Sequence, residues 1–374
     1  MRSTLARLLW LCSVLAAGCA PCSVPVAAPG LAYLGQIRLP PNTTVEGTTV
    51  GGLSGISYDA GRDCYYVISD DRSAHGPARF YTVRLSVSDR GVDDATISAV
   101  HPLLDPGGRP FTPRSVDGAP PDPEGIAFDS GRQRLYWSSE GERITGGPHG
   151  RVLADPWVRI AGLDGSYLGE FALPPQLAMS AQRTGPRRNK ALEGLTVTAD
   201  GRSLFAAMEG PGYDDGALPD QAHGALTRVT VYRLDAGGNP GAPAAQYAYP
   251  LEPATPPADT NGLTDLVALS DTAFLVIERA YGTRPTVRLF RAEIGDATDV
   301  LGVPALTGHA VTPMTKTLLA DLTATPGLDP LDNIEGITLG PRLPDGRQTV
   351  VLVSDDNFAP SQVTQFLAFA MPGP

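Results

Sequence analysis

One short phrase recurs five times along the chain, at intervals of about 70 residues. Each copy has an acidic or small residue, usually followed by Gly, then an apolar run, a turn and a second apolar run that ends in carboxylates. The copies begin at Leu53-Ser54-Gly55-Ile56, Pro123-Glu124-Gly125-Ile126, Leu192-Glu193-Gly194-Leu195, Leu263-Thr264-Asp265-Leu266 and Ile334-Glu335-Gly336-Ile337. A fixed period across the whole chain indicates a repeat architecture.

Each repeat holds more than this first hairpin. Residues 79–85 alternate between apolar and polar side chains, which is typical of a strand, and residues 96–104 predict another. Pairs of this kind recur at 157–163 and 167–173, at 228–234 and 245–251, and at 287–294 and 315–322. No stretch has a clear helical period. Four antiparallel strands per unit predict the blades of a β-propeller.

The fifth repeat is one strand short, with strands expected at 334–339, 349–354 and 363–370 before the chain ends. The missing strand is expected at residues 32–39, so the N-terminal strand would close the last blade and remove the exposed edges. The prediction is an all-β protein, a single β-propeller domain over residues 31–374 with five four-stranded blades. Six blades are the alternative, if a long linker hides a further sheet.

The first residues have the character of an export signal. Arg2 and Arg7 precede an apolar stretch too short to span a membrane, and Leu15-Ala16-Ala17-Gly18-Cys19 resembles a bacterial lipobox. We therefore expect residues 1–18 to be a lipoprotein-type signal peptide, Cys19 to be lipidated, and residues 19–30 to form a flexible tether. The alternative is ordinary secretory cleavage nearby, for instance after Ala28.

Cysteine use and charge agree with export. Cys22 and Cys64 would remain beside the lipidated cysteine, either paired in an oxidising compartment or as two thiols. Residues 1–18 contain two arginines and no acid, so the formal charge of −11 becomes −13 after cleavage. This acidity argues against nucleic-acid binding, which needs a basic surface, and favours cation binding.

The repeated carboxylates are expected to converge. The start of the inner strand of a blade lies beside the end of the antiparallel second strand, and rotation from blade to blade turns such pairs into a ring. Carboxylates so close together repel one another by about 4 kcal/mol at 4 Å. Hard cations with oxygen ligands relieve this repulsion, and Ca²⁺ accepts irregular sets of oxygens. The candidate metal ligands are Asp70, Asp71, Glu124, Glu140, Glu193, Glu209, Glu278, Glu335, Asp355 and Asp356.

Not every acid in the repeats belongs to this set. We interpret Asp59, Asp129, Asp200 and Asp345 as ordinary turn residues.

Basic residues are expected at the same mouth. Arg72, Arg143 and Arg279 follow second strands, and Arg187, Arg188 and Lys190 precede the third inner strand. Guanidinium and ammonium groups around a metal suit a phosphate ester, since they neutralise charge in the transition state. We assign catalytic roles to Glu193, Glu335, Arg279, Arg72 and Lys190. Histidine is sparse, and His75, near Asp70-Asp71-Arg72, is a candidate acid or base.

At these residues the chain resembles the phytase-like propeller family, also described as esterase-like activity of phytase. The resemblance rests on segments at 54–59, 69–72, 122–126, 189–195, 274–279, 333–337 and 354–358, and extends from about Leu34 to Phe369. It implies an exported β-propeller with phosphoesterase activity, and its acidic positions fall on Asp71, Glu124, Glu193, Glu278, Glu335 and Asp355. The fourth repeat departs from the Glu-Gly pattern with Thr264-Asp265.

These observations lead to one main hypothesis and two rivals. The main hypothesis is a Ca²⁺-dependent phosphoester hydrolase, exported and either lipid-anchored at the outer face of the membrane or secreted. We expect a monomer that acts on a phosphorylated small molecule and meets the membrane only through its lipid. The rivals are a non-catalytic surface propeller that binds a ligand or partner protein, and a lactonase-like carboxyl-ester hydrolase that uses the same metal site.

Overall fold

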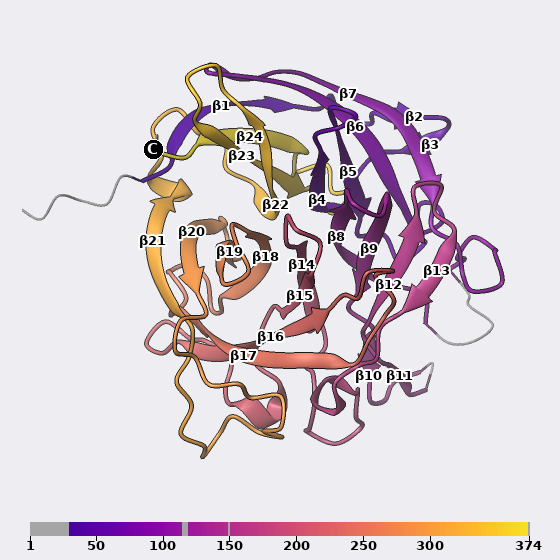
Figure 1. Cartoon of the computed structure of the whole chain (residues 1–374), viewed down its shortest axis with the longest axis vertical. Coiled ribbons are helices and arrows are strands. Elements are labelled where there is room, and N and C mark those ends of the chain that lie inside the picture. The colour runs from indigo at the N-terminus through magenta and orange to yellow at the C-terminus, as the bar shows by residue number, and fades with distance from the viewer. Residues whose placement is uncertain (1–29, 114–118, 149, 373–374) are drawn as a thin grey trace, which may run out of the picture.

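The computed structural model shows twenty-four strands and three short 3-10 helices in the part of the chain that it describes, which is residues 30–113, 119–148 and 150–372. Twenty of the strands form five four-stranded antiparallel sheets, arranged as the blades of a ring (Figure 1). The predicted five-bladed β-propeller is confirmed. The predicted signal peptide, Cys19, Cys22 and the predicted tether up to residue 29 lie outside the described residues.

The blades follow one another along the chain, and in each the strand that carries the repeated phrase is innermost. Blade 1 contains β4 (Leu53–Asp59), β5 (Cys64–Ser69), β6 (Arg79–Ser88) and β7 (Gly91–Pro102). Blade 2 contains β8 (Pro123–Asp129), β9 (Arg134–Ser139), β12 (Trp157–Gly162) and β13 (Tyr167–Glu170). Blade 3 contains β14 (Leu192–Val197), β15 (Ser203–Met208), β16 (Ala225–Arg233) and β17 (Pro243–Leu251).

Blades 4 and 5 complete the ring. Blade 4 contains β18 (Gly262–Ala268), β19 (Ala273–Ala280), β20 (Thr286–Glu293) and β21 (Thr315–Asp321). Blade 5 contains β22 (Asn333–Arg342), β23 (Gln348–Asp355), β24 (Gln365–Ala370) and β1 (Ala32–Arg38). Strand β1 pairs antiparallel with β24, from Ala32 opposite Ala370 to Arg38 opposite Gln365. The predicted exchange of the N-terminal strand is confirmed, and it closes the ring.

Short elements decorate the loops between the blade strands. They are the hairpins β2 (Thr44–Val45) with β3 (Thr48–Thr49) and β10 (Glu142–Ile144) with β11 (Val152–Ala154), and the 3-10 helices η1 (Pro175–Leu177), η2 (Tyr213–Asp215) and η3 (Leu322–Ala324).

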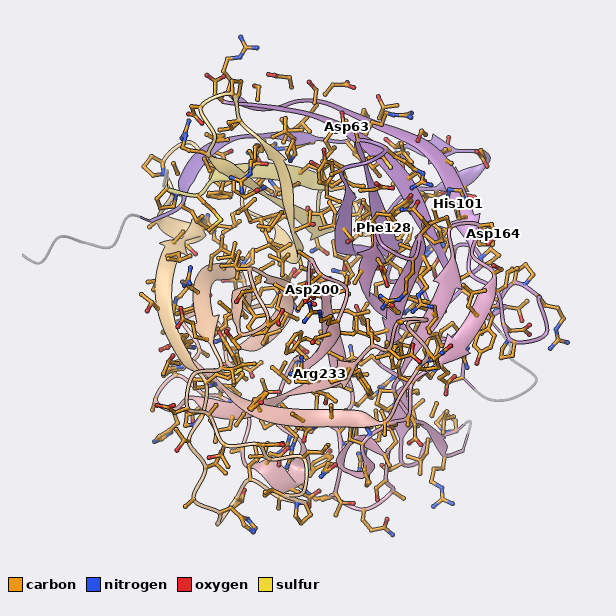
Figure 2. The ribbon with its side chains drawn as sticks, in the orientation of Figure 1. Asp63, His101, Phe128, Asp164, Asp200 and Arg233 are labelled. Atoms are coloured by element: carbon orange, nitrogen blue, oxygen red, sulfur yellow. The ribbon has the colours of Figure 1, made fainter. Side chains whose placement is uncertain are left out.

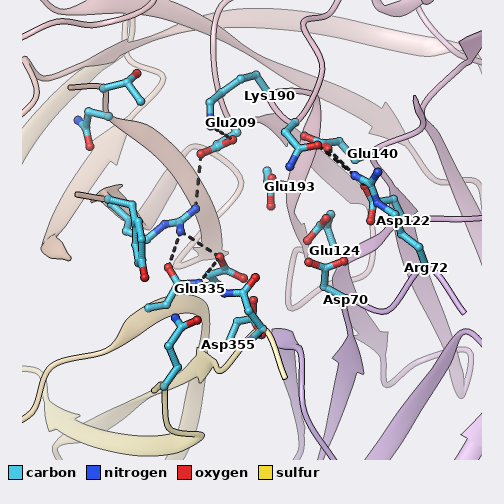
Figure 3. Close-up of a pocket in the computed structure, with 18 residues that line it drawn as sticks. Asp70, Arg72, Asp122, Glu124, Glu140, Lys190, Glu193, Glu209, Glu335 and Asp355 are labelled. Atoms are coloured by element: carbon cyan, nitrogen blue, oxygen red, sulfur yellow. Dashed lines mark hydrogen bonds and ion pairs between the residues drawn. The ribbon is translucent and has the colours of Figure 1, made fainter. Parts of the chain in front are cut away.

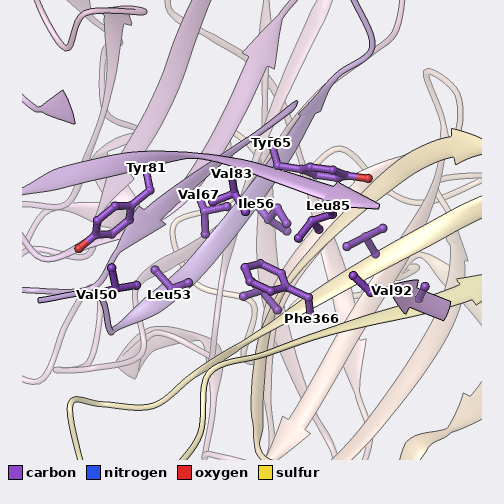
Figure 4. Packing of buried hydrophobic residues seen from close by; sticks show 13 residues of the cluster. Val50, Leu53, Ile56, Tyr65, Val67, Tyr81, Val83, Leu85, Val92 and Phe366 are labelled. Carbon is purple, nitrogen blue, oxygen red and sulfur yellow. The ribbon is translucent and has the colours of Figure 1, made fainter. Parts of the chain in front are cut away.

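The hydrophobic core lies between neighbouring blades. One cluster joins blade 1 to blade 5, and packs Ile56 and Val83 against Val353 and Phe366 (Figure 4). Similar clusters fill the other four blade interfaces. Polar side chains such as His101 and Asp164 lie towards the outer edge of the ring (Figure 2). Apolar burial at all five interfaces stabilises the ring as one unit.

Contact between inner strands is very close at the glycine of the repeated phrase. A Cβ atom at Gly55 would lie 2.6 Å from the Glu124 carbonyl oxygen, and one at Gly125 would lie 2.6 Å from the Glu193 carbonyl oxygen. Real Cβ atoms essentially never approach backbone that closely. The glycine therefore follows from the narrow channel of a five-bladed ring, where backbone packs on backbone.

Candidate functional site

A pocket of about 410 Å³ opens at the end of the channel where the inner strands begin. It is lined mainly by charged and amide side chains, contributed by all five blades. Eight carboxylates line it: Asp70, Asp122, Glu124, Glu140, Glu193, Glu209, Glu335 and Asp355. Three cationic side chains join them, those of Arg72, Lys190 and Arg279. The predicted convergence of acids at one mouth is thus present in the structure (Figure 3).

A β-bulge at the same register of every inner strand presents the first set of these side chains. In blade 2, Pro123 pairs with Ser139 and Ile126 with Trp137, so Glu124 and Gly125 together oppose a single residue. Equivalent shifts occur in the inner strands of the other four blades. A bulge redirects side chains, and this one turns Glu124, Glu193 and Glu335 towards the pocket. In the other two blades Ser54 and Thr264 occupy the position.

The second set comes from the ends of the second strands. The structural equivalents are Asp70, Glu140, Glu209, Arg279 and Asp355. Four blades thus supply a carboxylate here and blade 4 supplies a guanidinium. Blade 4 therefore places Thr264 and Arg279 where the other blades mostly place acids. The ring is asymmetric in charge as a result.

Arg279 compensates the acids of the two blades beside it. Its Nη1 lies 3.2 Å from Glu335 Oε1 and its Nη2 lies 3.6 Å from Glu209 Oε1. Burial disfavours the charged guanidinium, but Glu335 and Glu209 outweigh it and raise the pKa of Arg279. Within the described residues its one hydrogen bond runs from Nη1 to Asn333 Oδ1, and Nε is buried without a partner. Donor capacity therefore remains for an anionic ligand.

The other two cations are more fully engaged. Lys190 Nζ donates to Glu209 Oε2 at 2.6 Å. Arg72 donates from Nη1 to Glu142 Oε2 at 2.9 Å and from Nη2 to Asp122 Oδ2 and Asn189 Oδ1. Burial alone would raise the pKa of Glu142, but the hydrogen bond from Arg188 and the charge of Arg72 lower it. Arg72 and Lys190 thus hold acids in place around the pocket.

Among the described residues, no cation pairs with the carboxylates of Asp70, Glu124 and Glu193. No hydrogen bond or ion pair from the described residues reaches the carboxylate of Glu193, which is 9% exposed. Glu124 accepts one hydrogen bond, from Ser54 Oγ at 3.0 Å. Burial, followed by the charges of neighbouring carboxylates, holds the pKa of Asp70, Glu124 and Glu193 well above its ordinary value. This half of the pocket has an excess of negative charge.

Two groups of three carboxylates in this half can each surround a metal ion. One is Asp70, Asp122 and Glu124, and the other is Glu124, Glu140 and Glu193. Within each group one oxygen from every residue lies within 4.8 Å of the others. Oxygens that bind one Ca²⁺ at 2.3–2.6 Å are separated by no more than about 5 Å, so the residues present fit the ion.

Three of the predicted metal ligands are not brought into the pocket. Glu278 pairs with Leu263, and Gly262 pairs with Arg279, so Arg279 holds the pocket position and Glu278 points to the opposite face of the sheet. There Glu278 accepts hydrogen bonds from Tyr249, Asn261, Lys316 and the Glu252 backbone nitrogen.

Asp71 and Asp356 directly follow pocket residues and point elsewhere. Asp71 accepts from the backbone nitrogens of Ala74 and His75 and pairs with the buried Arg79 at 2.7 Å. Asp356 accepts from the backbone nitrogens of Gly52 and Phe358 and from Thr364 Oγ1. Both carboxylates close turns at the mouth of the pocket.

Several other predicted residues also lie outside the pocket lining. The guanidinium groups of Arg143 and Arg187 donate to backbone carbonyls and pack on the ring of Tyr213. His75 stacks on Phe358 with ring centroids 4.0 Å apart. The four acids interpreted as turn residues are confirmed, since each accepts backbone nitrogens of its own hairpin turn: Asp59, Asp129, Asp200 and Asp345.

Asp122 and Asn333 are pocket residues that the ring argument did not assign. Asp122 precedes the inner strand of blade 2, and its carbonyl accepts from the backbone nitrogen of Glu140. Asn333 opposes Asp355 in blade 5. Its Oδ1 accepts a hydrogen bond from Arg279 Nη1, and its Nδ2 donates one to Glu335 Oε1. Both stand directly before the apolar residue of the repeated phrase, so an alignment of the repeats that extended one residue further would have found them.

The fold and the site define a five-bladed β-propeller with an acidic, metal-competent pocket at one channel mouth. The family described as "Phytase-like: Esterase-like activity of phytase" matches residues 48–358, so the chain belongs to this family. No curated protein matches the sequence.

Solved structures similar to this chain include a galactanase and a galactosidase. One is an exo-β-1,3-galactanase from Phanerochaete chrysosporium, with 14% identity and a TM-score of 0.47 over 90% of this chain and 65% of that one. The other is a β-1,3-galactosidase of glycoside hydrolase family 43, with 9% identity and a TM-score of 0.45 over 92% of this chain and 95% of that one.

Proposed function

We propose that the protein is a metal-dependent phosphoester hydrolase, with Ca²⁺ as the metal and the pocket at the channel mouth as its active site. The observation that carries the proposal is that one pocket holds two groups of carboxylates on blades 1 to 3 that can each surround a metal ion and, on blade 4, the guanidinium of Arg279. A metal and a cation on opposite sides of one space suit an ester whose phosphoryl group carries negative charge.

The residues of the chain take separate roles in this proposal. The carboxylate groups of blades 1 to 3, which share Glu124, would hold the metal, and the bound metal would polarise a phosphoryl oxygen and lower the pKa of a water molecule. Arg279 keeps donor capacity on Nε and Nη2 and binds the phosphoryl oxygens. Glu335 holds the guanidinium in place through Nη1. Arg72 and Lys190, to which the sequence assigned catalysis, position neighbouring acids instead.

The test is an assay of the full mature protein after chelation and after resupply of Ca²⁺, Mg²⁺, Mn²⁺ or Zn²⁺. Substrates are a phosphomonoester, a phosphodiester and a carboxyl ester of p-nitrophenol. We expect phosphoester turnover that requires metal and falls at least 100-fold in Glu193→Gln. The control is Glu293→Gln at the exposed end of β20 in blade 4, where the side chain pairs with Arg291.

Two outcomes would replace this function with a rival. Metal binding without turnover of either phosphoester would favour a non-catalytic propeller that binds a ligand or partner protein. Turnover of the carboxyl ester alone would favour a lactonase-like hydrolase. Activity that is unchanged in Glu193→Gln would remove the pocket from the reaction.

Export and lipid anchoring are part of the same proposal. Among the described residues, none of the helices has the length and apolar character that crossing a bilayer requires. We infer that membrane attachment, where it occurs, is through lipidated Cys19. Mass spectrometry of the mature N-terminus tests this: a lipid-modified Cys19 is expected, and an unmodified terminus beginning near residue 29 would indicate secretion instead.

A further inference from the structure

The two groups of three carboxylates share one residue. Glu124 belongs to the group with Asp70 and Asp122 and also to the group with Glu140 and Glu193. A glutamate has two carboxylate oxygens, so a single Glu124 can bind one cation through each of them. In Figure 3, Glu124 lies between Glu193 and Asp70, with Asp122 and Glu140 nearby.

Each group also contains a buried acid with a carboxylate oxygen that the described residues leave unpaired. In the first group, Asp122 Oδ1 is buried with no hydrogen-bond partner among the described residues, and Asp122 is 2% exposed. In the second, the carboxylate of Glu193 has no hydrogen bond or ion pair with the described residues. Leaving a buried charged group unpaired is costly, so both groups indicate a ligand that the chain itself does not supply.

The charge of the pocket also exceeds what one cation can balance. With all groups ionised, the eight carboxylates and three cationic side chains leave an excess of five negative charges. One divalent cation reduces the excess to three, and two reduce it to one. A phosphoryl group brings further negative charge, so its binding at this site requires the stronger compensation.

Arg72 contacts one carboxylate of each group. Its guanidinium pairs with Asp122 of the first group and lies 4.0 Å from Glu140 Oε2 of the second. It also pairs with Glu142 at 2.9 Å, outside both groups. Arg72 therefore holds one carboxylate of each group in position, and it leaves Asp122 Oδ1 free to bind a cation.

From these contacts we propose that the pocket binds two divalent cations, one held by Asp70, Asp122 and Glu124 and the other by Glu124, Glu140 and Glu193, with Glu124 as the bridge. The inference deepens the proposed function, since a pair of metals stabilises both the attacking and the leaving oxygen in phosphoryl transfer. Binding of the cations themselves does not depend on turnover.

The test is calorimetric titration of the chelated full mature protein with Ca²⁺, with metal analysis of the protein after dialysis. We expect two ions for each wild-type chain. Asp122→Asn and Glu140→Gln each remove one ion and leave the other, whereas Glu124→Gln weakens both at least tenfold. Glu293→Gln keeps two ions. Thermal melting of each chelated variant establishes that it is folded.

The results that overturn the inference are equally specific. One ion for each wild-type chain would overturn it, and a shared proton between Asp70 and Asp122 would then account for the first group. Loss of a single ion in Glu124→Gln would also overturn it, because the bridge would be absent. Two ions with no phosphoester turnover would uphold this inference and overturn the hydrolase. Turnover with one ion would do the reverse.

Discussion

The guanidinium of Arg279 in blade 4 pairs with the carboxylate of Glu335 in blade 5, with Nη1 and Oε1 3.2 Å apart. Arg279 stands at the register position where the other four blades place an acid. One basic residue thus breaks the symmetry of a five-fold repeat and divides the pocket into a compensated and an uncompensated half. The two groups of carboxylates that can hold a metal contain neither Glu209 nor Glu335, the acids with which Arg279 pairs.

Replacement of Arg279 by Gln is expected to affect both stability and activity. The change leaves Glu335 and Glu209 buried without their shared partner, so unfolding by urea should show a loss of about 3 kcal/mol. Phosphoester turnover should fall because the phosphoryl group loses its donor. Arg279→Lys should restore stability in part and activity less, since a single ammonium cannot bond several acceptors in the same fork geometry. Equal activity in all three proteins would contradict the role of Arg279.

Glu278 and Glu193 provide a matched pair that tests the register of blade 4. Glu278→Gln should lower stability by about 3 kcal/mol, because Glu278 pairs with the buried Lys316, and should leave Ca²⁺ affinity unchanged. Glu193→Gln should do the opposite, since it removes an unpaired buried charge and a metal ligand. Urea denaturation and Ca²⁺ titration of both variants measure the two effects. A loss of Ca²⁺ affinity in Glu278→Gln would show that Glu278, rather than the adjacent Arg279, faces the pocket.

The one-residue difference between Glu278 and Arg279 shows where prediction from the sequence stopped being accurate. The repeats fixed the number of blades, the exchange of β1 and seven of the eight pocket carboxylates, because periodicity in sequence becomes rotation in space. The position of a residue in the strand register predicts whether its side chain reaches the pocket better than its being an acid does. Glu278 has the right chemistry at an adjacent position, and in a strand an adjacent side chain faces the other way.

Asp71 and Asp356, which were also predicted to be metal ligands, lie outside the pocket for a related reason. Each directly follows a pocket residue along the chain, and its carboxylate accepts hydrogen bonds from a turn instead. The division of the pocket by Arg279 depends on contacts between blades, and no spacing along the chain encodes those contacts. The β-bulges could not be predicted from the sequence either, although the glycine that follows the acid in the repeated phrase lies within them.

Stability of the metal-free protein is expected to fall as the pH rises. Burial, with the charges of neighbouring acids, raises the pKa of Asp70, Glu124, Glu140 and Glu193 in the folded state. The unfolded chain releases these protons near pH 4, whereas the folded chain retains them to higher pH. The contribution of these groups is therefore complete below about pH 4 and is lost as the pH rises through the folded pKa values.

Thermal melts in chelator between pH 5 and pH 8 measure this dependence. Saturating Ca²⁺ should raise the melting temperature most at the high end of the range, because it replaces the protons on the same carboxylates. A metal-free melting temperature that rises with pH over this range would contradict the assignment of uncompensated acids.

Replacement of the glycine in the repeated phrase, even by alanine, should destabilise the fold. Gly125→Ala places a Cβ atom 2.6 Å from the Glu193 carbonyl oxygen, and the blades must separate to accommodate it. We expect a loss of about 2 kcal/mol in urea unfolding. Gly146→Ala is the control, since nothing lies within 4 Å of a Cβ atom there. Equal stability of the two variants would show that the inner strands are not in contact at Gly125.

Asp265 takes the place of that glycine in blade 4 and joins three inner strands. Its Oδ1 accepts from the backbone nitrogens of Leu195 and Leu266, and its Oδ2 accepts from Ile337 at 2.9 Å. Asp265→Asn turns an amide group towards one of these donors and leaves that donor buried and unpaired, so unfolding should become easier by about 2 kcal/mol. The neighbouring Thr264→Val removes a buried hydroxyl that has no hydrogen-bond partner among the described residues, and should therefore be neutral or stabilising. Urea denaturation of the two variants separates a carboxylate that holds blades together from a polar group that does not, and the opposite order of stability would refute this role for Asp265.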